Sequence, residues 1–119
     1  MTSDTRATTG RIGEEATAAL YRGRGFDVIV RNWRCDLGEI DVVARRGRLL
    51  VFCEVKTRSG DRFGGGFDAV TAVKRSKLRR LAETFLLQER PTFDSVRFDV
   101  ASVLVSGTRA DVELYEDAF

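Results

Sequence analysis

The apolar and polar positions of the chain first predict a helix over Arg11 to Arg24. This segment is rich in helix-forming residues, and Gly25 ends it. The polar stretch before the helix is expected to be a flexible N-terminus over residues 1–10. Four apolar side chains recur at helical spacing: Ile12, Ala16, Ala19 and Leu20.

Five strands are predicted from β-branched residues and from partial alternation of apolar and polar side chains. They are Phe26 to Arg34, Gly38 to Ala44, Leu49 to Thr57, Val96 to Val105 and Val112 to Tyr115. The second and third strands should form a hairpin, because only the glycine-containing turn Arg45 to Arg48 separates them.

A long second helix is predicted between the third and fourth strands. Thr71 is a suitable N-cap, the helix reaches about Glu89, and Pro91 ends it. A glycine-rich loop precedes the helix, and its Phe63 and Phe67 either fix the loop to the body or meet a ligand. The predicted apolar face of the helix consists of Leu78, Leu81, Ala82, Phe85 and Leu86.

Composition is typical of one soluble domain, with 43% apolar and 32% charged residues among 119. The longest apolar run, Leu49 to Cys53, is too short to span a membrane, and the N-terminus lacks the apolar core of a signal peptide. We therefore expect a cytoplasmic protein without a membrane partner. No linker or repeat divides the chain, so residues 11–119 should form a single α/β domain.

The absence of histidine excludes histidine general bases and cysteine/histidine zinc motifs. Any metal would be held by carboxylates, which favours a hard cation such as magnesium. The two cysteines, Cys35 and Cys53, are expected to be free thiols.

A net charge of +2 is too small to indicate nucleic-acid binding by itself, but the basic residues are clustered. The start of the second predicted helix carries five basic side chains and no acid: Lys74, Arg75, Lys77, Arg79 and Arg80. This helix face either contacts phosphates or is simply solvated, as basic helix faces often are.

Three charged residues interrupt the apolar strands of the predicted hairpin. Glu54 and Lys56 lie two positions apart and therefore share a face, and Asp41 interrupts the neighbouring strand. Two carboxylates about 4 Å apart would repel by roughly 4 kcal/mol at an effective dielectric constant near 20. A divalent cation would remove this repulsion, and the lysine could reach a water or a phosphate oxygen beside it. Such a site suits phosphodiester hydrolysis.

Each of these features also has a purely structural interpretation. A Glu-x-Lys pair on a strand is commonly a surface ion pair, and an aspartate near a turn is commonly hydrogen-bonded to the backbone. The functional interpretation depends on their combination: Asp41, Glu54 and Lys56 interrupt one hairpin at compatible positions, and a basic helix follows.

The order of an aspartate in one strand and Glu-x-Lys in the next resembles the PD-(D/E)XK nuclease superfamily, which includes restriction enzymes and archaeal Holliday junction resolvases. More closely, the chain resembles the YraN family of uncharacterised proteins over nearly its whole length. The segments that carry this resemblance are "GEE" at 13–15, "RNWRCDLGEIDVVA" at 31–44, "VFCEVKTR" at 51–58, "AVT" at 69–71, "RFDV" at 97–100 and the terminal "AF".

The resemblance implies a restriction endonuclease-like core, with a mixed β-sheet flanked by helices. It implies catalytic roles for Asp41, Glu54, Lys56 and Glu14. It also implies a Mg²⁺ or Mn²⁺ cofactor bound by Asp41, Glu54 and Val55. The nucleic-acid-binding residues are then expected to be Lys74, Arg75, Lys77, Arg58 and Thr57.

The expected function is therefore metal-dependent hydrolysis of DNA, especially branched or structured DNA. Two alternatives remain: a non-catalytic nucleic-acid-binding module, and a protein-interaction module in DNA or RNA processing. Relatives with this fold often work as dimers, so a homodimer is an expectation. Helix spacing does not separate Glu14 from Glu15. Glu39 shares the strand phase of Asp41 and could support a ligand, but a surface acid at a strand end is the more common case.

Overall fold

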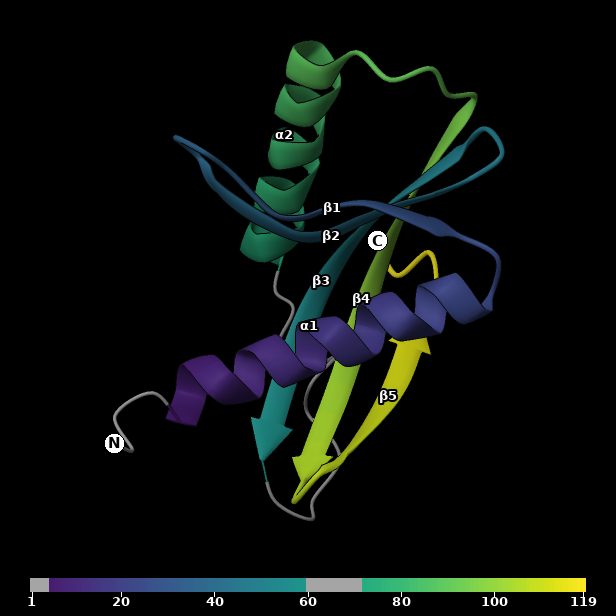
Figure 1. Cartoon of the computed structure of the whole chain (residues 1–119). Helices are drawn as coiled ribbons and strands as arrows, with labels where there is room; N and C mark the ends of the chain where they lie inside the picture. Colours follow the sequence, from purple (N-terminus) through teal and green to yellow (C-terminus); the bar gives the residue numbers. More distant parts are fainter. Residues whose placement is uncertain (1–4, 60–71) are drawn as a thin grey trace.

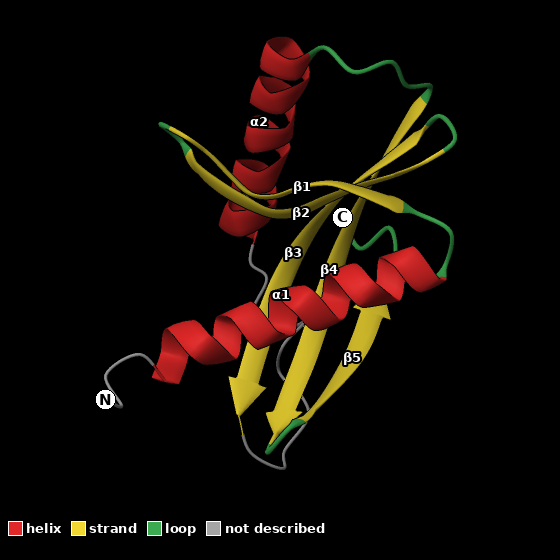
Figure 2. Ribbon diagram, in the orientation of Figure 1, coloured by secondary structure: helices red, strands yellow, loops and turns green. Residues whose placement is uncertain are grey.

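The structure of the chain is a computed structural model that describes residues 5–59 and 72–119. In it a five-stranded sheet lies between two helices (Figures 1 and 2). The elements are α1 (Thr5–Gly23), β1 (Asp27–Cys35), β2 (Gly38–Arg46), β3 (Leu49–Ser59), α2 (Ala72–Glu89), β4 (Ser95–Ser106) and β5 (Arg109–Tyr115). The predicted Thr71 cap and the loop phenylalanines Phe63 and Phe67 lie outside the described residues.

The sheet is mixed, with the strand order β1-β2-β3-β4-β5. Only β3 and β4 are parallel, and the other neighbouring pairs are antiparallel. The β2–β3 hairpin predicted from the short turn is present, and Gly47 in that turn has φ 62°, which suits glycine. This arrangement confirms the α/β class and is compatible with a restriction endonuclease-like core.

The core has two layers, one on each face of the sheet. Val51 and Cys53 of β3 pack in the layer under α1, while Leu50 and Phe52 pack in the layer under α2. This alternation follows from the two-residue period of a strand. The predicted apolar face of α2 is correct, since Leu78, Leu81, Ala82 and Phe85 are buried and Leu86 packs beside them.

The four apolar positions noted at helical spacing mark the packed face of α1 only in part, since Ala16 and Leu20 are half-buried. Ile12 remains 37% exposed and Ala19 is exposed, whereas Gly13, Thr17 and Tyr21 are buried. The absence of a side chain at Gly13 lets the helix approach β3 closely: a Cβ atom on Gly13 would lie 2.0 Å from Oγ1 of Thr57. Close approach therefore decides the rotation of α1, and the alanine-rich stripe does not.

Helix α1 also begins earlier than expected. Residues 5–10, predicted to be flexible, belong to the helix. The predicted start was placed at the first apolar residue of the periodic pattern. The first turns of α1 lie before that residue, so the pattern does not reveal them.

Among the described residues, no helix is long and apolar enough to cross a membrane.

A buried polar network explains the "RFDV" motif of β4. Asp99 is fully buried and accepts hydrogen bonds from the Tyr21 hydroxyl at 2.6 Å and from the Arg97 guanidinium at 2.9 and 3.0 Å. The backbone amide of Asp117 donates to the same carboxylate at 3.0 Å. Because a buried carboxylate needs such partners, this motif joins α1, β4 and the C-terminal segment.

Candidate metal centre

Asp41 lies where the side-chain alternation of β2 changes phase. Ile40 packs in the core layer under α2, yet Val42 packs in the layer under α1, although residues two apart in a regular strand share a face. On β1, Asn32 lies between the two residue pairs that flank Asp41, and its φ of 54° is left-handed. Irregularities of this kind bend a strand and redirect a side chain, here that of Asp41.

The redirected carboxylate of Asp41 bonds to the backbone of β3. Regular pairing between β2 and β3 reaches Val42 and Cys53, and beyond it the Val55 amide donates to Oδ2 of Asp41 at 2.7 Å. A side-chain oxygen thus takes the place of a strand carbonyl. This bond holds Asp41 beside the segment of β3 that carries Glu54 and Lys56.

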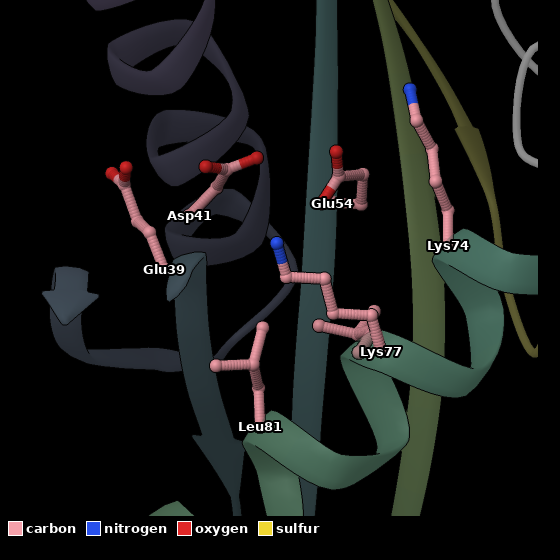
Figure 3. Close-up of a pocket in the computed structure, with 7 residues that line it drawn as sticks. Glu39, Asp41, Glu54, Lys74, Lys77 and Leu81 are labelled. Atoms are coloured by element: carbon pink, nitrogen blue, oxygen red, sulfur yellow. The ribbon is translucent and has the colours of Figure 1, made fainter. Parts of the chain in front are cut away.

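Asp41 and Glu54 line one hollow of about 280 Å³ between the sheet and α2 (Figure 3). The complete lining is Glu39, Asp41, Glu54, Lys74, Lys77, Leu78 and Leu81. The Lys77 side chain points toward the space between the two carboxylates. The structure therefore brings together the acids that the hydrophobic pattern of the hairpin singled out.

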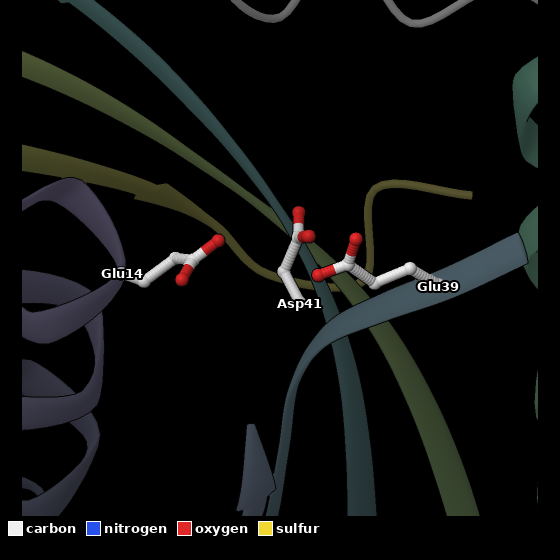
Figure 4. Close-up of side chains that lie close together, drawn as sticks. All are labelled: Glu14, Glu39 and Asp41. Atoms are coloured by element: carbon white, nitrogen blue, oxygen red, sulfur yellow. The ribbon is translucent and has the colours of Figure 1, made fainter. Parts of the chain in front are cut away.

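A tighter cluster of acids surrounds Asp41. Ligand oxygens of Glu14, Glu39 and Asp41 all lie within 4.8 Å of one another, and the three side chains come from α1 and β2 (Figure 4). Three half-buried carboxylates at this spacing fit a hard divalent cation such as Mg²⁺ or Mn²⁺. Glu54 is not one of these three and lies in the adjoining hollow. From the sequence, Glu39 was only a possible support for a ligand, because it shares the strand phase of Asp41; in the structure it lies in the acid cluster.

The two neighbouring acids of α1 have different surroundings. Glu14 accepts a hydrogen bond from Nδ2 of Asn32 at 3.1 Å and points toward Asp41 (Figure 4). Glu15 is 60% exposed and pairs with Arg31 at 2.6 Å and Arg22 at 3.8 Å. The choice that helix spacing left open is resolved geometrically: Glu14 belongs to the acid cluster, and Glu15 belongs to a surface ion-pair network.

Burial and the charge of Glu54 raise the pKa of Asp41 to about 7. The hydrogen bond from Val55 acts in the opposite direction but does not outweigh them. A carboxyl group with this pKa is only partly ionised at neutral pH, and a nearby cation would favour its ionised form. The acid cluster therefore gains electrostatically from binding a divalent ion.

Lys56 is not among the residues that line the hollow, but it contacts two residues that do, Glu54 and Lys74. Its ammonium lies 3.6 Å from Oε2 of Glu54, and both side chains are mostly buried, at 21% and 28% exposure. A hydrogen bond with Lys56 and the charge of Lys56 lower the pKa of Lys74. Two ammonium groups thus lie close together beside the carboxylates, where an anion could offset their repulsion.

The other predicted nucleic-acid contacts occupy different places. Arg75 is exposed on α2, together with Lys74 and Lys77, and Arg58 is exposed near the end of β3. Thr57 packs against Gly13 of α1, so its side chain belongs to the contact between helix and strand.

The arginines of the β2–β3 turn are engaged within the molecule. Arg45 donates to the carbonyl of Thr92, Arg46 lies 4.4 Å above the ring of Phe26, and Arg48 pairs with Asp94 at 2.7 Å. These contacts give the turn arginines a structural role.

The Trp33 side chain packs edge-on against Phe85. Its ring centroid lies 5.3 Å from that of Phe85, and its indole N–H donates to Glu89 at 3.3 Å. Trp33 is therefore part of the contact between β1 and α2.

Residues 13–103 match the sequence profile of uncharacterised protein family UPF0102. The chain belongs to UPF0102, the YraN family. The matched range includes every acid of the cluster, Glu54 and Lys56.

Similar UPF0102 proteins occur in distant bacteria. The chain is 46% identical to a UPF0102 protein of Mycolicibacterium vanbaalenii over 107 residues, which cover 90% of this chain and 88% of the relative. It is 44% identical to one of Moorella thermoacetica over 97% and 98% of the two chains. With one of Dictyoglomus thermophilum it shares 38% identity over 92% and 95%. The similarity to these UPF0102 proteins therefore extends over nearly the whole domain.

Proposed function

We propose that this UPF0102 protein is a metal-dependent nuclease that hydrolyses phosphodiester bonds of DNA. The observation that carries the proposal is the meeting of Asp41 and Glu54 in one hollow with lysines of α2. Branched or structured DNA is the proposed substrate, because the strand motif resembles that of archaeal Holliday junction resolvases.

The acids of the site would hold the metal. Glu14, Glu39 and Asp41 supply closely spaced carboxylate oxygens, and Glu54 and Val55 are the further ligands expected from the motif. When bound, Mg²⁺ or Mn²⁺ polarises a phosphate and lowers the pKa of a coordinated water.

The lysines have separate tasks in this proposal. Lys56, whose ammonium lies 3.6 Å from Glu54, would orient a water or offset negative charge on phosphate oxygens. Lys74 and Lys77 line the same hollow and would bind the DNA backbone. The hydrogen bond from Val55 keeps Asp41 oriented, which limits the reorganisation needed for metal binding.

One observation favours a second candidate function. The ion pair between Lys56 and Glu54 resembles a structural pair, in which the lysine is occupied by its neighbour. In that case the domain would be a non-catalytic module that binds nucleic acid or another protein.

Cleavage assays distinguish these functions. Linear, flapped and four-way DNA are incubated with the protein in Mg²⁺, in Mn²⁺ and in a chelator. The proposal expects cation-dependent cleavage, strongest on a branched substrate and lost in Asp41→Asn. Binding without cleavage in either metal would instead support the non-catalytic module. Absence of both binding and cleavage would support a protein-interaction role.

A further inference from the structure

A second hollow adjoins the acid cluster and receives no side chain from α2. Its volume is about 360 Å³, and its lining comes from α1, β1 and β2: Gly10, Arg11, Glu14, Asn32, Arg34 and Glu39. Glu39 also lines the first hollow, and Glu14 and Glu39 belong to the acid cluster. The acid cluster therefore lies between two hollows, one bordered by lysines of α2 and the other by arginines of α1 and β1.

The arginines of the second hollow make only long, weak contacts with other side chains. The Arg34 side chain is 76% exposed and lies 3.8 Å from Glu39, a distance longer than a hydrogen bond. Arg11 donates to Thr8 at 3.5 Å, and it has no ion-pair partner among the side chains that the structure describes. Exposed ion pairs of this kind contribute about 0–1 kcal/mol. Both guanidinium groups are therefore available to an anion, and their geometry suits phosphate.

We propose that the second hollow is a phosphate subsite, in which Arg11 and Arg34 bind the backbone of a nucleic-acid strand. The strand runs from the lysines of α2 across the acid cluster to these arginines. The inference rests on the proposed function and adds a substrate class to it. A strand that crosses clustered carboxylates is repelled by them, and cations on both sides offset that repulsion. Lys74 and Lys77 act on one side, and Arg11 and Arg34 act on the other.

The subsite defines which bond is cleaved. A strand held on both sides presents an internal phosphodiester to the acid cluster, whereas a mononucleotide or a terminal phosphate reaches only one set of cations. The substrate class is therefore a polynucleotide with phosphates on both sides of the reacting bond.

The test is the salt dependence of DNA binding, measured in a chelator so that no cleavage intervenes. Fluorescence anisotropy of a labelled flapped DNA is recorded between about 50 and 200 mM salt. We compare the unmodified protein, Arg11→Ala/Arg34→Ala and Lys74→Ala/Lys77→Ala. The matched control is Arg22→Ala/Arg109→Ala, which also removes one arginine from α1 and one from a strand. Arg109 is 77% exposed, like Arg34, but lies on the edge strand β5.

Each site double variant should weaken binding and reduce the slope of log K against log salt by about 2, since each phosphate contact contributes about 0.7–0.9. The control should keep nearly the full slope, and thermal melting verifies that all variants fold. If Arg11→Ala/Arg34→Ala behaves like the control while Lys74→Ala/Lys77→Ala loses binding, the subsite is wrong and the proposed nuclease stands. If the unmodified protein binds no DNA in the chelator, the subsite is contradicted, and the nuclease proposal is contradicted as well only if cleavage in Mg²⁺ and in Mn²⁺ is also absent.

Discussion

The backbone amide of Val55 donates a hydrogen bond to the Asp41 carboxylate at 2.7 Å, beyond the last regular pair between β2 and β3. Through this bond one strand orients the central acid of the neighbouring strand. The same local geometry brings the Asp41 carboxylate near Glu14 and Glu39. It also places this carboxylate in the hollow that Glu54 and two lysines line. A local departure from regular strand geometry thus assembles the candidate metal centre.

The adjacent glutamates of α1 form a natural matched pair. Glu14→Gln should weaken Mn²⁺ binding about tenfold or more, because it removes a charged oxygen from the acid cluster. Glu15→Gln should leave Mn²⁺ affinity nearly unchanged, because Glu15 pairs with surface arginines. Isothermal titration calorimetry measures both. Equal affinities of the two variants would remove Glu14 from the site.

The raised pKa of Asp41 gives a dependence of stability on pH. The folded-state pKa of about 7 exceeds the unfolded value of about 3.9. Between these values the folded state binds more protons than the unfolded state, so the free energy of unfolding should fall as the pH rises from about 4 to about 7. Without divalent metal, this group should lower that free energy by on the order of 2 to 4 kcal/mol at pH 8.

Urea unfolding at pH 5 and pH 8 in a chelator tests this dependence. Asp41→Asn should lose most of the pH-dependent decrease and should be more stable than the unmodified protein at pH 8. Asp111→Asn is the control, since Asp111 lies on β5 and pairs with Arg109. An unchanged pH dependence in Asp41→Asn would contradict the assigned pKa.

Replacement of Lys56 separates catalysis from binding. Lys56→Ala should reduce DNA cleavage by a factor of 100 or more, while DNA affinity decreases only slightly, because α2 keeps its basic surface. Lys56→Arg retains the positive charge and should keep part of the activity, although its planar group differs in geometry. Single-turnover cleavage and anisotropy measure the two properties. Full activity of Lys56→Ala would exclude the proposed role.

The contact between α1 and β3 predicts a stability effect at Gly13. Gly13→Ala should destabilise the fold by about 1–3 kcal/mol, because its Cβ would lie 2.0 Å from Oγ1 of Thr57. Gly10→Ala, in the same helix, has no atom within 4 Å of the added Cβ and should be neutral or stabilising by up to about 1 kcal/mol. Thermal unfolding compares the two variants. Similar melting temperatures would show that α1 moves to accommodate the side chain.

The sequence predicted the strands and α2 well because large side chains dominate their patterns. Phe85 and Leu81 form the buried face of α2, and the apolar residues of β3 identify it as a buried strand. Helix α1 differed because its contact depends on the small size of Gly13, which a hydrophobic pattern does not register.

The candidate site was predictable only in part. Asp41 and Glu54 were recognisable because each interrupts an apolar strand. The grouping of Glu39 with Asp41 was suggested only by their shared strand phase, because the direction of the Asp41 side chain depends on the phase change of β2 and on the left-handed backbone of Asn32. Likewise, the position of Glu14 in the acid cluster and of Glu15 on the surface can be told apart only once the rotation of α1 is known.

The most direct test of the central claim is a Mn²⁺ titration of the unmodified protein and of Asp41→Asn at pH 8, with Asp111→Asn as control. The account predicts saturable Mn²⁺ binding that Mg²⁺ displaces, an increase in melting temperature on binding, and an affinity at least tenfold weaker in Asp41→Asn alone. An unmodified protein that neither binds nor is stabilised by either cation, or an Asp41→Asn variant that binds Mn²⁺ equally well, would contradict it.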